Sequence, residues 1–327
     1  MKTRFCFGLF LLIIWVFECA WPARSSAQAA PQFSRVQRGA NREIALTLSG
    51  QAGAYYHLDA ATNLQAWNIL ATLASGGGAS LQYTDSAAPF LEARYYRAQQ
   101  LFGTNLFTGD HLPTTNGDVI IQPRNHATFL LWWQDRTIYV DPTDAATYTG
   151  LPKADLILIT HAHSDHFNTA TINAVHGTNA LIVAPQDVYN QLTAPQKTIA
   201  RVLGYGASTN LLGFDIQALP AYNSYHPLGT GNAYVLTIGG RRILISGDTG
   251  NTPELRAVTN IDLAFVCMNQ PYTMTVSEAT NAVTAFHPKV VYPYHYRDQS
   301  GASANAAVFK QQLRTELGIE VRLRKWY

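Results

Sequence analysis

The sequence predicts two folded parts in one chain, a small all-β module followed by a larger α/β sandwich. Short β-rich segments separated by glycine and proline turns fill residues 30–100, which is typical of a small β-sandwich. From residue 101 onward, apolar strand segments alternate with helical stretches, and this pattern favours sheets covered by helices. We therefore expect domains at 30–100 and 101–327, since 327 residues are enough for two cores.

The expected elements follow from β-rich runs, helical periodicity and turn residues. In the module, we expect strands at 44–48, 55–60, 67–73, 81–84 and 94–98. In the sandwich, we expect strands at 119–122, 128–133, 137–140, 156–160, 180–183, 233–238, 242–246, 262–266 and 289–292. Helices are expected at 168–176, 276–286 and 303–316. The pair Gly239-Gly240 predicts a hairpin between two of these strands.

Residues 1–29 have the organisation of a secretory signal peptide. Lys2 and Arg4 precede an apolar run at 5–17, and small residues end in an Ala-x-Ala site at Ala29. A membrane anchor is the alternative, but the run is shorter than the ~20 residues of a spanning helix. We expect cleavage after Ala29, no stable membrane span afterwards, and export to the periplasm or exterior of a bacterial cell.

The composition argues against several classes of protein. With 47% apolar and 13% charged residues, the chain can form a folded core. It has no long basic run, so we expect no nucleic-acid partner. Removal of 1–29 would leave 20 basic and 20 acidic residues out of 23 and 21. Cys267 would then be the one cysteine left, which excludes an intramolecular disulfide, and we expect it to be a buried thiol.

Metal-ligating side chains concentrate in the segment that follows the expected strand 156–160. Residues 161–166 read His-Ala-His-Ser-Asp-His. Imidazoles and carboxylates suit Zn, Mn or Fe, and such groups crowded together are unfavourable without a cation between them. A polar surface loop is the alternative, but the spacing after a buried strand favours a metal site.

One loop does not supply enough ligands for two catalytic ions, since each needs about three protein ligands. Asp248, His295 and His226 each lie just before or after an expected strand, and the carboxylate of Asp248 can bridge two ions. His176 and His287 are rivals of His226. Both lie at expected helix ends, where a structural role is typical.

The ordered set of Asp141, the cluster 161–166, His226, Asp248 and His295 resembles the metallo-β-lactamase-fold hydrolases. Within them the chain is similar to the ascorbate-6-phosphate-lactonase-like branch, with some likeness to the phospholipase D-type enzymes that cleave N-acyl phosphatidylethanolamines. The branch cues are Asn-His-Ala-Thr-Phe at 125–129, Asn-Ala-Tyr-Val at 232–235 followed by Gly-Asp-Thr, and Tyr-Pro-Tyr-His at 292–295. The resemblance covers 105–327 and implies an αββα sandwich with two metal ions at one edge of its sheets.

The resemblance also implies roles for single residues. It implies that His161, His163 and His226 hold one ion, that Asp165, His166 and His295 hold the other, and that Asp248 bridges both. Asp141 would orient a ligand histidine or the following loop. His126 resembles a family histidine near the site, and a buried hydrogen-bonded role and a catalytic role both stay open. The two divalent ions are expected to be Zn, with Mn or Fe as alternatives.

These residues predict a hydrolase. Two neighbouring cations lower the pKa of a shared water toward neutrality, and the metal-bridging hydroxide would attack an ester, lactone or phosphoester. Asp165 and Asp248 are the expected catalytic carboxylates, and Asp165 would accept a proton from the bridging water. A serine nucleophile is disfavoured, because the histidines around Ser164 are used by metal and Ser246 lacks a Gly-x-Ser-x-Gly elbow.

The substrate is expected to be a small molecule that meets aromatic and amide side chains. The candidates that flank the ligands are Tyr222, Asn223, Asn269, Tyr272 and Tyr296, with Tyr225 beside them. Lys289 and Arg297 are candidates for a phosphate but more typical of surface charges. His111 is expected at the surface.

Two other functional classes stay open at this point. One is an iron-dependent redox or sulfur enzyme on the same fold. The other is a non-catalytic protein whose metals are structural and whose β-module binds a surface or glycan. The stretch 56–67 resembles the immunoglobulin- or fibronectin-like modules of secreted bacterial proteins. We expect this module to contact a surface, a glycan or the catalytic domain.

Overall fold

The computed structural model describes residues 30–103, 107–297, 301–313 and 317–327. The predicted signal segment 1–29 lies outside the described residues. Close contacts divide the chain into two units, one ending at His111 and one from Leu112 to Tyr327. Within the described part, none of the helices has the length and apolar character needed to cross a membrane.

The first unit consists of antiparallel strands that enclose two small apolar clusters. One sheet has the order β1-β2-β5, and β3 pairs with β4 on one side and β6 on the other. The strands are β1 (Gln32–Arg38), β2 (Ile44–Ser49), β3 (Tyr55–Ala61), β4 (Asn68–Ala74), β5 (Ser80–Asp85) and β6 (Tyr95–Leu101), with a 3-10 helix at Ala88–Phe90. Leu46 of one sheet packs with Leu58 and Tyr96 of the other. The immunoglobulin- or fibronectin-like class of this unit stays a prediction.

The second unit contains two mixed sheets. The first has the order β8-β9-β10-β11-β12-β13 and is parallel from β10 to β13. Its strands are β8 (Gly117–Asn125), β9 (Thr128–Trp133), β10 (Arg136–Val140), β11 (Ala154–Leu158), β12 (His176–Ala184) and β13 (Ala200–Val202), and β7 (Gly109–Thr114) precedes them in the chain. A 3-10 helix at Ala145–Tyr148 lies between β10 and β11.

The second sheet runs in sequence order from β14 to β20. Its strands are β14 (Ser208–Leu211), β15 (Phe214–Ala221), β16 (Gly231–Ile238), β17 (Arg241–Ile245), β18 (Leu263–Cys267), β19 (Val290–Tyr294) and β20 (Glu320–Val321). It is antiparallel up to β17 and parallel beyond. The predicted hairpin between β16 and β17 is confirmed, and Gly239 and Gly240 both have positive φ, 52° and 78°, which a tight two-residue turn requires.

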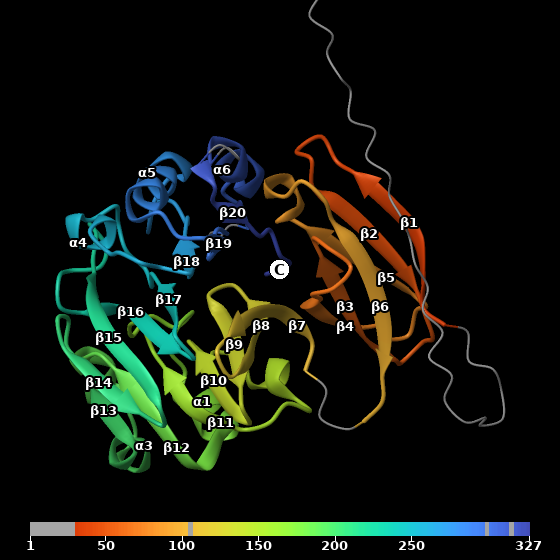
Figure 1. The fold of residues 1–327 in the computed structure, drawn as a ribbon. Coiled ribbons are helices and arrows are strands. Elements are labelled where there is room, and N and C mark those ends of the chain that lie inside the picture. Colours follow the sequence, from red (N-terminus) through yellow and green to blue (C-terminus); the bar gives the residue numbers. More distant parts are fainter. Residues whose placement is uncertain (1–29, 104–106, 298–300, 314–316) are drawn as a thin grey trace, which may run out of the picture. The chain divides into compact units, whose positions relative to one another are not determined.

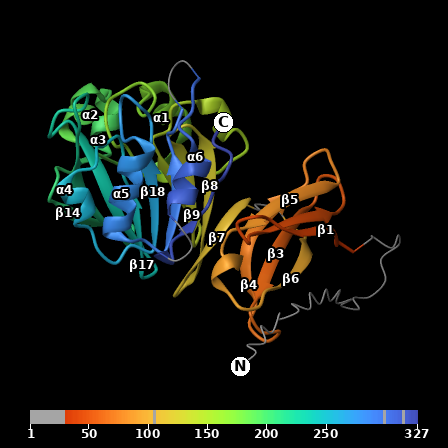
Figure 2. The same ribbon diagram turned by 90° about the horizontal axis from the view of Figure 1, so that it is seen from above.

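Helices cover the outer faces of both sheets (Figures 1 and 2). They are α1 (Thr169–Val175), α2 (Gln186–Gln191), α3 (Ala194–Thr198), α4 (Pro253–Arg256), α5 (Val276–Phe286) and α6 (Ala306–Gln312). Ile172 of α1 and Val188 of α2 pack on Ile157 of the first sheet. Phe129 and Phe265, one from each sheet, stack with ring centroids 4.0 Å apart in the main core.

The predicted strands of this unit are present, and helices 168–176 and 276–286 correspond closely to α1 and α5. Helix 303–316 is shorter than predicted: α6 starts after Asn305, whose side chain caps it, and ends at Gln312. Residues 314–316 lie outside the described part. The sequence did not predict β13 and β14, which are short and carry few apolar residues. It also did not predict β15, although residues 214–218 alternate between buried apolar and exposed polar side chains.

Candidate metal centre

The candidate site lies where β11, β17 and β19 end, since the cluster 161–166 follows β11, Asp248 follows β17, and His295 follows β19. Asp141 follows β10 and holds the cluster in place. The backbone N–H and hydroxyl of Thr160 donate to the two carboxylate oxygens of Asp141 at 2.8 and 2.7 Å, and Nδ1 of His166 donates to Oδ2 at 2.8 Å. With Nδ1 so bonded, Nε2 of His166 is left to face the site.

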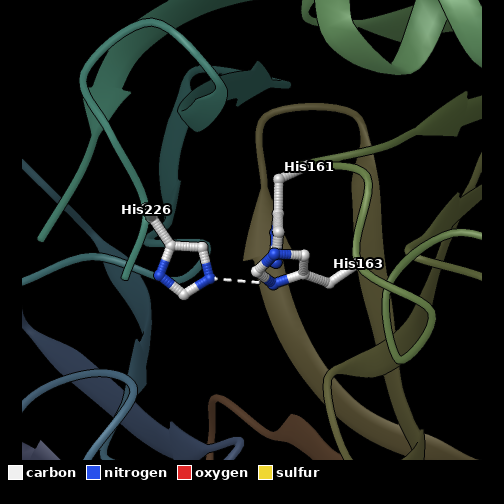
Figure 3. Close-up of side chains that lie close together, drawn as sticks. All are labelled: His161, His163 and His226. Carbon is white, nitrogen blue, oxygen red and sulfur yellow. Dashed lines mark hydrogen bonds between the residues drawn. The ribbon is translucent and has the colours of Figure 1, made fainter. Parts of the chain in front are cut away.

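Three groups of side chains bring possible ligand atoms within 4.8 Å of one another. They are His161-His163-His226, His161-His166-Asp248 and His126-Asp165-His295. Figure 3 shows the first group, in which His226 approaches from the loop after β15 and the other two from the loop after β11; Nε2 of His226 lies 3.1 Å from Nδ1 of His163. All seven predicted ligands therefore converge, and His126 joins them.

Asp248 lies at the centre of these groups. Its Oδ1 is 3.3 Å from Nε2 of His166, and its Oδ2 is 3.4, 3.7 and 3.9 Å from Nε2 of His295, His226 and His161. Burial opposes ionisation of this carboxyl, but the charges of His295 and His166 outweigh it and hold the pKa of Asp248 well below its usual value. The carboxylate is thus ionised and surrounded by imidazoles.

Several buried atoms of the site have no hydrogen-bond partner among the described residues. They are Nε2 of His161, Nε2 of His166, Oδ1 of Asp248, and Nδ1 and Nε2 of His295. A buried polar atom left unpaired costs about 1–3 kcal/mol. His161, His166 and Asp248 form one of the three groups, and imidazole nitrogens beside a carboxylate oxygen suit a divalent cation.

The pKa shifts of the histidines fit a site that can accommodate a cation. Burial, followed by the charge of His166, holds the pKa of His161 well below its usual value. For His166, burial is outweighed by the carboxylates of Asp248 and Asp141, which hold its pKa well above the usual value. A cation in the cluster would neutralise the same carboxylates without a proton on His166.

His226 is oriented by Asn223, a role that the sequence did not reveal. Oδ1 of Asn223 accepts hydrogen bonds from the N–H of Tyr225 at 2.8 Å and from the N–H and Nδ1 of His226 at 3.1 and 3.0 Å. Its Nδ2 donates to the carbonyl of Tyr272 at 2.9 Å. The proton on Nδ1 leaves Nε2 of His226 as the nitrogen that faces His163.

The rivals of His226 lie outside the three groups. His176 ends α1 and its Nδ1 contacts the carbonyl of Gly177, whereas His287 ends α5 with a left-handed backbone. The expectation that His111 is exposed is wrong: it is 5% exposed and bonded to the hydroxyl of Thr72 at 2.8 Å.

The backbone of the site is unusual at three of these positions. Asp141, His126 and His295 have φ of 45°, 53° and 46°, in the left-handed region that side chains other than glycine seldom occupy. Each follows the end of a strand, and the left-handed turn directs the side chain into the site.

A pocket opens onto the cluster. His126, His163, Ser164, Asp165, Tyr225, His226, Asp248, Asn269, Tyr272 and His295 line it. Of the expected substrate-binding residues, Asn269 and Tyr272 are on its wall, while Tyr222, Asn223 and Tyr296 are not. The hydroxyl of Tyr222 donates to Glu254 at 3.0 Å, and the ring of Tyr296 packs against Tyr327. The side chain of Asn223 is engaged by His226 and Tyr272.

The other nucleophile candidates do not serve the site. Ser246 is fully buried and donates to the carbonyl of Gly247. Cys267 is a buried free thiol, as predicted, and burial raises its pKa to about 11. Ser164 lines the pocket, but the histidines beside it belong to the ligand groups.

Known proteins are similar to this chain in sequence and in fold. Residues 121–295 match the β-lactamase superfamily domain. A "UPF0173 metal-dependent hydrolase" of Thermococcus onnurineus is 32% identical over 200 residues, which is 57% of this chain and 88% of that protein. One from Pelotomaculum thermopropionicum is 29% identical over 220 residues, which is 61% of this chain and 93% of that protein.

Solved structures agree. A protein of Parabacteroides distasonis assigned as a metal-dependent hydrolase is 38% identical and matches with a TM-score of 0.61, covering 68% of this chain and 100% of that one. The metallo hydrolase Igni18 of Ignicoccus hospitalis shares the fold at 24% identity, with a TM-score of 0.56 over 63% of this chain and 95% of that one. The chain therefore belongs to the β-lactamase superfamily and is a metal-dependent hydrolase. The narrower ascorbate-6-phosphate-lactonase-like branch stays a prediction.

Proposed function

We propose that the chain binds two divalent ions, with Zn as the first choice, and hydrolyses an ester, lactone or phosphoester, preferring an uncharged ester or lactone. The observation that carries the proposal is the convergence of seven ligand side chains, five of whose buried atoms lack a hydrogen-bond partner among the described residues. Seven ligands with a central carboxylate suit two ions better than one.

The proposed ligand assignment is the one that the family resemblance implies, and its first set is one of the three groups. His161, His163 and His226 would hold one ion, Asp165, His166 and His295 the other, and Asp248 would bridge. Asp248 supports this assignment because it lies within 3.9 Å of histidines from both sets. When bound, two such ions lower the pKa of water toward neutrality and polarise the oxygen of the electrophile.

The chain's own groups would position the substrate and accept a proton. Asp165 is the candidate acceptor, because its side chain is 41% exposed and lines the pocket, whereas Asp248 is buried. Burial opposes its ionisation, but hydrogen bonds from His126 and His295 hold the pKa of Asp165 well below its usual value. It is therefore an anion at neutral pH.

The pocket wall supports an uncharged substrate. Neither Lys nor Arg is among the described residues that line it. The rings of Tyr225 and Tyr272 meet edge to face at 5.2 Å and form an apolar wall. Oδ1 of Asn269, a residue only 4% exposed, has no hydrogen-bond partner in the described part of the chain. An aromatic wall with one unpaired amide is typical of sites for neutral ligands.

The candidate cations for a phosphate are engaged elsewhere. Lys289 pairs with Asp262 at 2.8 Å, and Nε of Arg297 donates to the carbonyl of Gly301 at 3.2 Å. The negative charge of a phosphomonoester would therefore be balanced by the metal ions alone. We rank this substrate class below an uncharged ester or lactone.

Metal analysis beside a substrate panel tests the proposal. Protein purified without added metal is expected to carry about two ions per chain. It should hydrolyse neutral lactones and carboxylic esters faster than a phosphomonoester or a β-lactam. Fewer than about one ion per chain, together with no turnover, would overturn it.

We also propose that the protein is exported. Cell fractionation, with a check of whether residues 1–29 have been removed from the exported protein, would test this.

A further inference from the structure

Both the side chain and the backbone of His126 make hydrogen bonds within the chain. Its Nδ1 lies 3.0 Å from the hydroxyl of Tyr327, and its Nε2 lies 3.2 Å from Oδ2 of Asp165. Its backbone N–H donates to the carbonyl of Trp326, and its carbonyl accepts from the N–H of His295. The segment Trp326-Tyr327 thus reaches the metal centre through His126.

Counting hydrogen bonds at the Tyr327 hydroxyl assigns the tautomer of His126. This oxygen accepts from the backbone N–H groups of Tyr296 and Arg297 at 3.2 and 3.1 Å. A phenol has one hydrogen. Since its acceptor positions are used, that hydrogen is directed at Nδ1 of His126. A neutral imidazole whose Nδ1 accepts carries its own proton on Nε2, and there it donates to Asp165.

The phenol is fixed in position from several directions. Trp326 is 1% exposed and packs between Phe129, Phe265 and Tyr294, with ring centroids 5.7 to 6.3 Å away. The guanidinium of Arg297 lies 5.4 Å from the centre of the Tyr327 ring. Tyr327 is 43% exposed, but these contacts and its hydrogen bonds hold the hydroxyl in place as a donor.

We propose that Tyr327 and His126 are positioning residues: Tyr327 keeps His126 as an Nε2–H donor, and His126 in turn holds Oδ2 of Asp165. His126 is then not a metal ligand, although it lies in a ligand group. The same Oδ2 of Asp165 lies 3.4 and 3.9 Å from Nε2 of His295 and His166, so His126 would fix the orientation of the carboxylate oxygen that faces these ligand nitrogens. The proposal resolves the open role of His126 and rests on the proposed metal site at Asp165.

Nitrogen NMR of the imidazoles tests the tautomer directly. The full chain, labelled with ¹⁵N, is compared metal-free and loaded with Zn, and His126 is assigned by the loss of its signals in His126→Gln. Nε2 is expected to be protonated in both states. In Tyr327→Phe, the Nδ1–H form should gain population. A wild-type His126 that is protonated on Nδ1, or whose Nε2 binds Zn, would overturn the proposal.

Kinetics and metal affinity separate positioning from simple packing. We expect kcat to fall about 10-fold in Tyr327→Phe and about 100-fold in His126→Ala, with KM unchanged. The Kd for the weaker ion should rise by similar factors in the two variants. This is the range found when the groups that hold metal ligands are mutated. His126→Gln should recover much of the loss, because its amide donates a similar bond. Equal loss in His126→Ala and His126→Gln, or an unchanged kcat in Tyr327→Phe, would contradict the role.

Two controls keep the outcomes distinct. Tyr205→Phe removes a hydroxyl from a tyrosine that is 51% exposed and does not line the pocket, so it should leave kcat and Kd unchanged. If the wild type binds no metal, the proposed function fails. The tautomer of His126, measured in the metal-free chain, would still show whether Tyr327 and His126 have the proposed positioning role.

Discussion

Buried carboxylates occur in both units, but they have different partners. In the first unit, Asp85 and Asp59 are 2% and 4% exposed, and each meets an arginine at 2.7 Å, Arg94 and Arg97 respectively. In the second unit, Asp248 is also 4% exposed, yet the ion pairs of the described residues give it only imidazoles, at 3.3 to 3.9 Å.

The difference separates a carboxylate that is paired with an arginine from one that is a candidate metal ligand. A guanidinium is always charged and satisfies a carboxylate with short hydrogen bonds. An imidazole supplies that charge only when it is protonated, and a metal-binding imidazole is neutral, so histidines in their ligand form need a cation beside Asp248. Partner chemistry therefore says more about the role of a buried Asp than its burial does.

The strongest test is the removal of charge at Asp248. Asp248→Asn keeps the size of the side chain but loses the anion between the two ligand sets. We expect kcat/KM to fall about 10³-fold, since metal-assisted charge stabilisation contributes several kcal/mol. Circular dichroism should show an unchanged fold, because the cluster is at the edge of the sheets. Retained activity with full metal content would contradict the comparison.

The same change at Asp85 should give the opposite result. Asp85→Asn leaves Arg94, whose side chain is 13% exposed, without its anion, and the loss of one partner of a buried pair costs about 3 kcal/mol. Urea unfolding should report this destabilisation. Turnover by the folded fraction and the metal content should be those of the wild type.

Removal of metal ions with a chelator should destabilise the second unit and leave the first unit unaffected. At a free metal concentration 100 times Kd, binding stabilises a folded unit by about 2.7 kcal/mol. Hydrogen exchange measured by mass spectrometry should therefore speed up in peptides from 112–327 after chelation. Peptides from 30–111 should be unaffected, and faster exchange there would show that the first unit also depends on metal.

The smallest expected effect is at Asp262, a buried carboxylate of the second unit that pairs with the cations of Lys289 and Arg241. Burial opposes its ionisation, but the hydrogen bond from Lys289 outweighs burial and lowers the pKa of Asp262. A lowered pKa stabilises the fold above the unfolded value of about 3.9, and this contribution is lost as pH falls through the folded pKa.

Lys289→Met tests this small term. The Lys289 side chain is 72% exposed, so we expect a loss of less than about 1 kcal/mol at pH 7. The difference from wild type in urea unfolding should shrink toward zero as the pH falls through the lowered pKa of Asp262. A difference that persists at low pH would show that the lysine acts by packing instead.

The sequence predicted the residues that meet in the candidate metal centre and most of the strands that carry them, because both are local patterns. Three histidines and an aspartate in six positions after a buried strand leave few interpretations. Asp248 and His295 were found because they follow apolar strands, whose ends meet at one edge of the sheets. The fold is that of the metallo-β-lactamases, as this order of ligands predicted.

The sequence did not predict the contacts that orient the site histidines, because these contacts join distant parts of the chain. Asn223 was expected to bind substrate, yet its amide orients His226 and binds the carbonyl of Tyr272, 49 residues away. The bond between His126 and Tyr327 spans 201 positions. No local pattern predicts that these segments meet.

The left-handed backbone at Asp141, His126 and His295 has a consequence for how such chains evolve. For most residues with a side chain, this conformation costs on the order of 1 kcal/mol or more, whereas glycine adopts it easily and asparagine and aspartate tolerate it. At His126 and His295, selection for stability alone would favour glycine or asparagine, whereas selection for activity would keep the imidazole. A chain of this fold that no longer catalyses should therefore drift toward glycine or asparagine at these two positions.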